Sequence, residues 1–284
     1  MSEITLPPDD LVESAVRAAL AEDLGAAGDI TSAATIPADA QATATFGTRK
    51  AGTLAGLPIA QVVFRAVDPT VSFVAMRHDG DRLAPGDVVA RVAGNARAVL
   101  AAERVALNYL CHLSGIATAT AALVDRVKGT RAVILDTRKT TPGLRAFEKY
   151  AVACGGGTNH RFGLYDAILI KDNHIAVAGG VAKAIRAARA HAPGVKLEIE
   201  VASLAELAEA MAEKPDIVLL DNMSVADMRQ AVAYVGGRAK LEASGSVTLD
   251  TIAAIAETGV DYISSGSITH SAPALDLGLD VVVT

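Results

Sequence analysis

The chain has 284 residues, of which 51% are hydrophobic and 20% charged, so it can bury a sizeable core and is not disordered. Its 26 basic and 32 acidic residues give a net charge of −6, which excludes a general nucleic-acid binder, and the absence of Trp argues against stacking on single strands. The two cysteines, Cys111 and Cys154, are too few for a disulfide framework. The acidic N-terminus lacks a signal-peptide pattern, and we therefore expect a cytoplasmic protein.

The first third of the chain mixes helix and strand patterns. Residues 9–24 have apolar positions at helical spacing, whereas residues 41–57, 71–76 and 88–92 indicate short strands separated by turns. Residues 105–124 form the longest apolar stretch, but Asn, His, Ser and Thr interrupt it. We therefore expect a small α+β domain followed by a buried helix, and no membrane span.

From about residue 113 short apolar runs alternate with helical segments. Ser203 with Glu206 fits a capping box, Ser224 with Asp227 resembles one, and Thr248 is a candidate N-cap. This alternation predicts parallel strands in a closed or nearly closed α/β barrel, and no G-x-G-x-x-G motif supports a Rossmann fold instead. The predicted strands are residues 132–135, 167–170, 197–201, 217–220, 241–243 and 262–263.

Polar residues follow each of these runs, at the strand ends that line the active site of such a barrel. A chance arrangement of solvated charges would not follow strand ends so regularly, so we interpret this ring as functional. Its members are Asp136, Arg138, Lys139, Lys171, Asp172, Glu200, Asp221, Ser244-Gly245-Ser246 and Ser264-Ser265-Gly266-Ser267.

The early part of the ring is cationic. Several cations in one cavity repel each other unless an anion is bound, and guanidinium groups bind carboxylates in a bidentate manner, so a polyanionic substrate is predicted. The alternative is that Asp136, Asp166 and Asp172 neutralise the cations as ion pairs. The cations are Arg138, Lys139, His160, Arg161, Lys171 and His174.

The later part of the ring is acidic and then rich in Ser and Gly. Glu200 and Asp221 can hold Mg²⁺ directly or through water, bind sugar hydroxyls, or stabilise developing positive charge. The last two Ser/Gly loops occupy the usual phosphate position of such barrels. Strand alternation predicts an inward-facing, buried supporting network of Lys196, Glu198, Lys240 and Glu242.

Three glycines, residues 155–157, predict a tight turn that carries His160 and Arg161 over the barrel mouth. The neighbouring Cys154 lacks an evident acid partner, so we interpret it, like Cys111 and His112, as a core residue.

The central motifs are long enough to compare with known families. They are residues 136–145 (DTRKTTPGLR), 148–152 (EKYAV), 155–161 (GGGTNHR) and 169–174 (LIKDNH), supported by 28–31, 103–104, 107–108, 113–118, 219–222, 242–245 and 269–271. Together they closely resemble the quinolinate phosphoribosyltransferase family, also called nicotinate-nucleotide pyrophosphorylase (carboxylating), and the resemblance covers nearly the whole chain.

This resemblance implies an N-terminal α/β sandwich domain, residues 1–112 joined by 272–284, followed by a C-terminal α/β barrel of parallel strands, residues 113–271. It implies a cytoplasmic homodimer in which Arg104 enters the active site of the partner, and it leaves a hexamer of such dimers open. Neither nucleic acid nor membrane is an expected partner.

The resemblance also assigns roles to matching positions. The quinolinate carboxylates are expected to meet Arg138, His160, Arg161, Lys171 and Arg104 of the partner subunit. The expected catalytic residues, which meet phosphoribosyl pyrophosphate, are Lys139, Lys171, Glu200 and Asp221, and the last two would hold its Mg²⁺. The ribose 5-phosphate would be held by Ser244, Gly245, Ser246 and Gly266, with His270 nearby; Ser246 stands where many members have a second Gly.

The implied reaction transfers phosphoribose to quinolinate with decarboxylation, giving nicotinate mononucleotide, CO₂ and pyrophosphate, in de novo NAD biosynthesis. Other interpretations are a Schiff-base aldolase with Lys171 as the amine, and a non-catalytic binder of anionic metabolites. Proteins of the same fold linked to molybdenum transport and nicotinate phosphoribosyltransferase are nearer alternatives, but the number of cations fits a dicarboxylate better.

Overall fold

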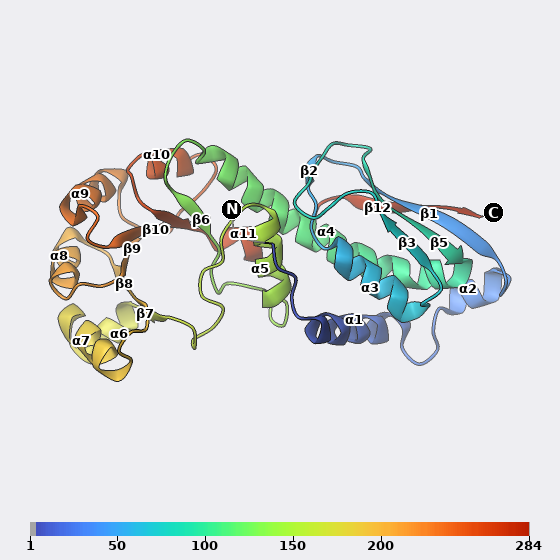
Figure 1. Cartoon of the computed structure of the whole chain (residues 1–284), viewed down its shortest axis with the longest axis horizontal. Coiled ribbons are helices and arrows are strands. Elements are labelled where there is room, and N and C mark those ends of the chain that lie inside the picture. The colour runs from blue at the N-terminus through green and yellow to red at the C-terminus, as the bar shows by residue number, and fades with distance from the viewer. Residues whose placement is uncertain (1–3, 284) are drawn as a thin grey trace. The chain divides into compact units, whose positions relative to one another are not determined.

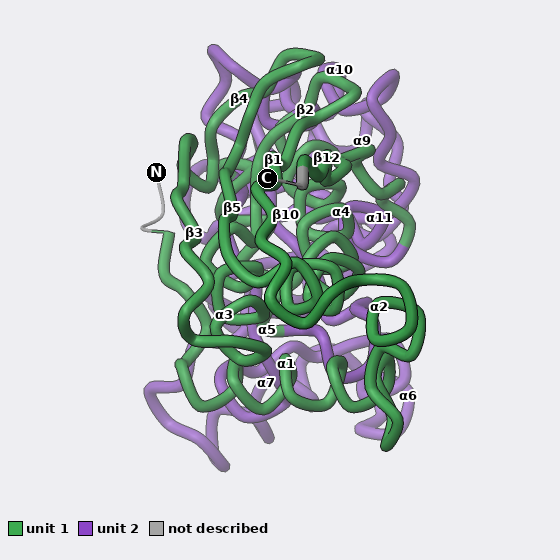
Figure 2. The backbone as a smooth tube through the Cα atoms, turned by 90° about the vertical axis from the view of Figure 1, so that its right-hand side faces the viewer, with its two compact units in different colours: residues 1–121, 146–156, 271–284 green, residues 122–145, 157–270 purple. Residues whose placement is uncertain are grey.

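The computed structural model describes residues 4–283 of the chain. These residues form two compact units, coloured separately in Figure 2. Unit 1 is built from residues 1–121, 146–156 and 271–284, and unit 2 from residues 122–145 and 157–270. Unit 1 thus combines three segments that are far apart in the sequence.

The core of unit 1 lies against an antiparallel sheet of four strands in the order β12-β1-β5-β3. Side chains on β1 alternate between buried and more exposed positions, as expected for a sheet covered on one face. Phe46 of β1 is opposite Ala90 of β5 and Leu279 of β12. The strands are β1 (Gln41–Thr48), β3 (Ser72–Ala75), β5 (Val88–Asn95) and β12 (Leu277–Val283).

Helices and a second, two-stranded sheet complete unit 1. The ring of Phe64 in α3 packs edge-on against Phe46 with 5.8 Å between the ring centroids, which joins this helix to the main sheet. The predicted helix over residues 9–24 is confirmed. The helices are α1 (Asp9–Leu24), α2 (Ile30–Thr35), α3 (Leu57–Val67), α4 (Ala96–Arg126) and α5 (Arg145–Cys154), and the short strands are β2 (Gly52–Thr53) and β4 (Arg82–Leu83).

Helix α4 begins nine residues before the apolar stretch recognised in the sequence. Its length and composition alone would allow it to cross a membrane, but 56% of its most apolar window is buried inside the protein. Its polar residues have internal partners: Ser114 Oγ accepts the main-chain N–H of Ala55 at 3.0 Å, and Thr118 Oγ1 accepts that of Thr53 at 2.8 Å. The helix is therefore a buried core element, as predicted.

Unit 2 is an α/β fold around six parallel strands in the order β6-β11-β10-β9-β8-β7 (Figure 1). The apolar runs of β6, β7 and β9 are typical of strands covered on both faces, whereas β8 and β10 alternate apolar residues with charged or polar ones. Within the described residues β6 and β7 are the two edges of this sheet, and a single parallel bridge joins Leu135 to Thr158 beside β6. The strands are β6 (Val133–Leu135), β7 (Ile168–Ile170), β8 (Leu197–Val201), β9 (Ile217–Asp221), β10 (Lys240–Ser244) and β11 (Tyr262–Ser264).

The helices of unit 2 follow the predicted capping signals with one exception. Ser203 and Ser224 each accept a main-chain N–H three residues on, at 3.2 and 3.1 Å. Thr248 differs in position only: its Oγ1 accepts the main-chain N–H of Thr251 at 3.3 Å and its carbonyl oxygen accepts that of Ile252 at 3.0 Å, so it caps the turn that leads into α10, which itself begins at Ile252. The helices are α6 (Asp172–Ala178), α7 (Val181–His191), α8 (Leu204–Ala212), α9 (Val225–Val235), α10 (Ile252–Ala256) and α11 (Ser267–His270).

A buried carboxylate, Asp79, joins three segments of unit 1. It accepts the main-chain N–H groups of Gly56 and Leu57, at the start of α3, at 2.7 and 3.1 Å. It also accepts the hydroxyl of Tyr150, from α5, at 2.5 Å. Burial raises the pKa of Asp79 above its ordinary value, while these three donors oppose that rise.

We expect Tyr150→Phe to lower the free energy of unfolding by about 1–3 kcal/mol, because it leaves a buried carboxylate without one of its donors. The hydroxyl stabilises the ionised form, so the loss should be largest near pH 7 and shrink as the pH falls through the folded-state pKa of Asp79. Urea titrations at several pH values measure this. Tyr234→Phe, at an exposed position, is the control, and an equal loss at all pH values would contradict the prediction.

Candidate active site

The carboxyl ends of the strands in unit 2 surround a cavity of about 310 Å³. Eight of the residues singled out in the sequence line it together. They are Arg138, Lys139, His160, Arg161, Lys171, Glu242, Ser244 and Ser264, and the remaining lining residues are Thr137, Leu169 and Leu219.

Strand register explains why residues from distant motifs meet at one level. Ser244 of β10 is opposite both Asp221 of β9 and Ser264 of β11. Ser264 is in turn opposite Leu135, the residue that precedes the motif beginning at Asp136. Because all the strands are parallel, their carboxyl ends lie at the same end of the sheet. The polar residues there are therefore close to one another.

Two guanidinium groups are crowded in this cavity. Burial and the charge of Arg138 lower the pKa of Arg161, so the two groups repel each other. Nη1 of Arg161 donates to the main-chain oxygen of Ala167 at 3.3 Å. Nε of Arg138 is buried and has no hydrogen-bond acceptor among residues 4–283. A buried charged donor without an acceptor is costly, so this site is suited to an anion.

The nearby aspartates accept main-chain N–H groups, and Asp166 also attracts Arg161, as the ion-pair interpretation expects. Asp136 Oδ1 accepts the main-chain N–H of His160 at 2.8 Å. Asp166 accepts that of Phe162 at 2.6 Å, and Asp172 that of Asn173 at 2.7 Å. Each of these carboxylates thus uses at least one oxygen to accept a main-chain N–H group.

The acidic side of the site contains Glu200 and Asp221, at the ends of adjacent strands. Nζ of Lys171 donates to Glu200 at 3.0 Å, and Nδ2 of Asn222 donates to Asp221 at 3.1 Å. Carboxylate oxygens are the ligands that Mg²⁺ prefers. Two such groups at neighbouring strand ends fit a Mg²⁺ that arrives bound to an oxygen-rich substrate, rather than a metal enclosed by protein ligands.

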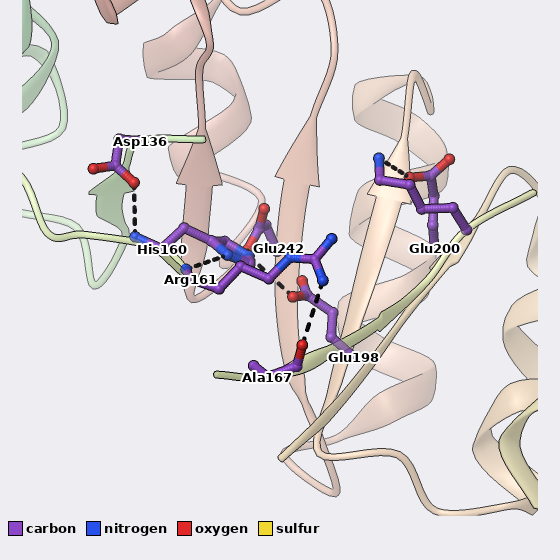
Figure 3. A network of polar contacts seen from close by, with 8 residues as sticks. Asp136, His160, Arg161, Ala167, Glu198, Glu200 and Glu242 are labelled. Carbon is purple, nitrogen blue, oxygen red and sulfur yellow. Dashed lines mark hydrogen bonds and ion pairs between the residues drawn. The ribbon is translucent and has the colours of Figure 1, made fainter. Parts of the chain in front are cut away.

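Beneath the cations lies a buried cluster of His160, Glu198 and Glu242, shown in Figure 3. Nε2 of His160 is 3.0 Å from Glu198 Oε2 and 3.4 Å from Glu242 Oε2. The other ring nitrogen, Nδ1, accepts the main-chain N–H of Arg161 at 2.7 Å. Asp136, at the end of β6, also holds this segment by accepting Nδ2 of Asn159 at 2.7 Å.

Charge and geometry act on the protonation of this cluster in opposite directions. Burial alone would lower the pKa of His160, but Glu198 and Glu242 raise it to about 10, which favours a second proton on the ring. Burial, together with Glu242, also raises the pKa of Glu198. The main-chain N–H of Arg161 points at Nδ1 and opposes a proton there, so the hydrogen bonds as they stand require the Nε2–H form, with Nε2–H facing the two carboxylates.

The prediction that two lysines and two glutamates form an inward-facing, buried network is therefore only half correct. Glu198 and Glu242 are buried and partnered by His160 rather than by lysines. Lys240 is at the amino end of β10, where it is largely exposed and pairs with Asp261 at 2.9 Å. Lys196 precedes β8 and is exposed, and it lines a smaller cavity of about 180 Å³ beside the two glutamates. The alternation was correct, but residues at a strand's amino end reach water.

The first Ser/Gly loop has an unusual backbone. Gly245 has φ +91°, and a Cβ there would lie 2.1 Å from Oδ1 of Asn222, so only glycine fits. Ser246 has φ +52° and Asn222 φ +50°, in the left-handed region. Ser246 thus adopts a backbone conformation that favours glycine, and backbone strain of this kind is common at ligand-binding loops.

The second Ser/Gly loop is joined to Lys139. A Cβ on Gly266 would lie 2.7 Å from Cδ of Lys139, so the missing side chain makes room for this lysine. Oγ1 of Thr269 donates to the main-chain oxygen of Lys139 at 2.7 Å. His270 ends the short helix α11 that follows the loop. Thr269 and Asn222 have supporting roles that were missed, although both lie inside motifs recognised in the sequence.

The glycines at 155–157 form the expected tight turn, in which Gly156 has φ +84°, and His160 and Arg161 beyond it line the cavity. Gly155 has a further role in packing. Gly155 lies where α5 approaches α4, since a Cβ there would be 2.5 Å from the main-chain oxygen of Ala117. Cys154 is buried, and burial raises the pKa of its thiol to about 12, which agrees with a core residue rather than a nucleophile. His112 is partly exposed and pairs with the buried Glu148 at 3.0 Å.

Arg104 lies on α4 in unit 1, with its side chain exposed. Its expected role depends on a second copy of the chain and remains a prediction.

Comparison with known proteins gives a consistent result. A family model described as the quinolinate phosphoribosyl transferase N-terminal domain matches residues 29–114, and one described as the C-terminal domain matches residues 116–280. A nicotinate-nucleotide pyrophosphorylase [carboxylating] of Mycobacterium leprae is 47% identical over 96% of this chain and 98% of its own length. A quinolinate phosphoribosyltransferase [decarboxylating] of Nicotiana tabacum is 42% identical over 97% of this chain and 83% of its own length.

Comparison with solved structures leads to the same family. The NadC structure from Streptococcus pyogenes superimposes with a TM-score of 0.95 at 46% identity, over 99% of both chains. A human nicotinic acid phosphoribosyltransferase, at 14% identity and a TM-score of 0.63 over 98% of this chain and 74% of its own length, shares only the fold. Matches in sequence and in structure thus extend through both units, and the chain belongs to the quinolinate phosphoribosyltransferase family.

Proposed function

We propose that this chain transfers the phosphoribosyl group of phosphoribosyl pyrophosphate to quinolinate and decarboxylates the product to nicotinate mononucleotide, in de novo NAD biosynthesis. Family membership supports this activity. The observation that carries it is the cavity that Arg138, Lys139, Arg161 and Lys171 line together, in which burial and the charge of Arg138 lower the pKa of Arg161. A dianionic pyridine supplies acceptors and offsets the repulsion.

The cationic side of the cavity is the proposed quinolinate site. Arg138 and Arg161 are half-buried and adjacent, so their guanidinium groups can each take one carboxylate. Lys171 lies across the cavity and pairs with Glu200. His160 lines the same cavity, below the cations.

The opposite side is the proposed site of phosphoribosyl pyrophosphate. The loops at Ser244, Gly245 and Ser246 and at Gly266, with His270 following, supply main-chain N–H groups and hydroxyls for the 5-phosphate. Glu200 and Asp221 would hold Mg²⁺, directly or through water. When bound, the metal neutralises the pyrophosphate and makes it a better leaving group.

The reaction then needs no covalent enzyme intermediate. As the C1–O bond to pyrophosphate breaks, positive charge builds on the ribose, where Glu200 or Asp221 offsets it, and Lys139 and Lys171 stabilise the departing anion. The pyridine nitrogen forms the new bond to C1. The C2–carboxylate bond then breaks, its electron pair is stabilised by the adjacent cationic nitrogen, and a proton takes the place of CO₂. The protein supplies proximity and charge neutralisation.

Quinolinate and nicotinate differ by one carboxylate, which makes them a direct test. Pyrophosphate release, and CO₂ release from quinolinate labelled in its 2-carboxyl group, should both occur with quinolinate. We expect kcat/KM for nicotinate to be lower by about 10³-fold or more, because it leaves buried donors without an acceptor. Comparable turnover of nicotinate would overturn the substrate assignment.

Arg161→Ala should lower kcat/KM for quinolinate by about 100-fold, with the larger part of the change in KM, because one charged bidentate contact is removed. Arg186→Ala is the control, since Arg186 is exposed on α7 and pairs with Glu213. Steady-state kinetics with each substrate varied gives the comparison. Kinetic constants close to wild type for Arg161→Ala would remove this residue from the site.

We also propose a cytoplasmic homodimer in which Arg104 completes the active site of the other subunit. The support is the family resemblance and the exposed position of Arg104 on α4. The acidic net charge of −6 supports neither a nucleic-acid nor a membrane partner.

Mixing two inactive variants tests the contribution of Arg104. Arg104→Ala and Arg161→Ala homodimers should each be impaired, and subunit exchange between them should restore about one quarter of wild-type activity, since half of the dimers then contain one intact site of two. No recovery, with exchange demonstrated by mass spectrometry of differently tagged subunits, would contradict a role between subunits.

A further inference from the structure

His160 has no free ring nitrogen to offer a substrate. Nδ1 accepts the main-chain N–H of Arg161 at 2.7 Å, and Nε2 faces Glu198 at 3.0 Å and Glu242 at 3.4 Å. The side chains of the two glutamates are 5% and 1% exposed, so water does not replace these contacts. The ring is therefore fully occupied within the protein, which differs from the role of carboxylate ligand expected for it.

A metal ion does not explain the cluster. The three side chains are close enough to hold one, with ligand atoms within 4.8 Å of each other. However, a metal-bound histidine donates its other N–H to an acceptor, whereas Nδ1 of His160 faces a donor, the N–H of Arg161. With Nδ1 used as an acceptor, Nε2 must carry the hydrogen and cannot ligate a metal.

The contacts instead form a chain that ends at the substrate site. Glu198 and Glu242 come from β8 and β10, which both flank β9. They hold the ring of His160 by its Nε2–H, and the ring holds the main chain of Arg161 through Nδ1. Asp136 fixes the main chain of His160 from the other side, as Figure 3 shows.

Burial of these two glutamates lowers the stability of the folded protein. Oε1 of Glu198 and Oε1 of Glu242 are buried and make no hydrogen bond to any described residue, and Oε2 of Glu242 has only the longer contact of 3.4 Å with Nε2 of His160. Buried carboxylates in this state are unfavourable, and apolar residues would pack the same space more cheaply. The charge of Glu198 does act favourably on Arg161, which it stabilises in its charged form. Retention of both groups beneath the guanidinium pair is thus explained by that pair.

We propose that Glu198 and Glu242 are positioning residues for the quinolinate site, which fix Arg161 through His160 and supply the negative charge that lets two guanidinium groups stay adjacent before substrate binds. This proposal rests on the proposed function. It makes His160 a link between the buried carboxylates and Arg161, and leaves contact with the substrate carboxylates to the arginines and Lys171.

Kinetics distinguishes positioning from general support of the fold. Glu198→Ala and Glu242→Ala should raise KM for quinolinate on the order of 10- to 100-fold, with KM for phosphoribosyl pyrophosphate within about threefold of wild type. Glu198→Gln should recover part of the loss, because its amide oxygen still accepts the Nε2–H although it carries no negative charge. Asp216→Ala is the matched control: this carboxylate precedes β9, at the amino ends of the strands, and bonds Arg189 and Leu197.

The control variant Asp216→Ala should lower the free energy of unfolding without changing KM for quinolinate or KM for phosphoribosyl pyrophosphate. An equal rise in both KM values for the glutamate variants, or no recovery in Glu198→Gln, would overturn the proposal.

A measurement on the wild-type chain does not depend on activity or on variants that fold poorly. Nitrogen-15 NMR of labelled histidine, with the signal of His160 identified by its loss in His160→Gln, should show the Nε2–H tautomer with Nδ1 unprotonated near neutral pH, both with and without quinolinate. A proton on Nδ1 would overturn the proposal. Failure of the wild-type chain to turn over quinolinate, with this tautomer present, would instead refute the proposed function.

Discussion

Repulsion between half-buried cations governs this active site. Arg138 and Arg161 line one cavity, and the charge of Arg138 disfavours the charged form of Arg161. Such a pair persists only if counter-charge is supplied. Within the protein, Glu198 and Asp166 supply negative charge that favours the charged form of Arg161. During the proposed reaction the substrate supplies the rest. Selectivity for a dianion thus follows from electrostatics as well as from shape.

The fold solves a geometric problem that this chemistry raises. Two highly anionic substrates must be held side by side, so a cationic half and an acidic, Mg²⁺-compatible half must share one cavity. Parallel strands deliver both, because each strand of unit 2 contributes its own terminal residue at a common level. Lys171 and Glu200, paired at 3.0 Å, come from neighbouring strands at the junction of the two halves.

Much of this could be predicted from the sequence. The six strands of unit 2 were found within one or two residues, because apolar runs of that length between capped helices admit few other interpretations. The residues at their ends were found for the same reason. The partner of a buried charge was harder to predict. Strand alternation indicated that Glu198 and Glu242 face the interior, but only the path of the loop that contains His160 shows that its ring contacts both carboxylates. Equally, no pattern reveals that Ser246 adopts a positive φ.

The position of β12 has a consequence for biosynthesis. This strand pairs with β1 along its whole length, yet between the two the chain must pass through all of unit 2. Because the chain is synthesised from its N-terminus, one edge of β1 therefore remains unpaired until nearly the whole chain has left the ribosome. An exposed edge of this kind is a template for pairing with other nascent chains, so unit 1 depends on delayed closure or on a chaperone that covers it meanwhile.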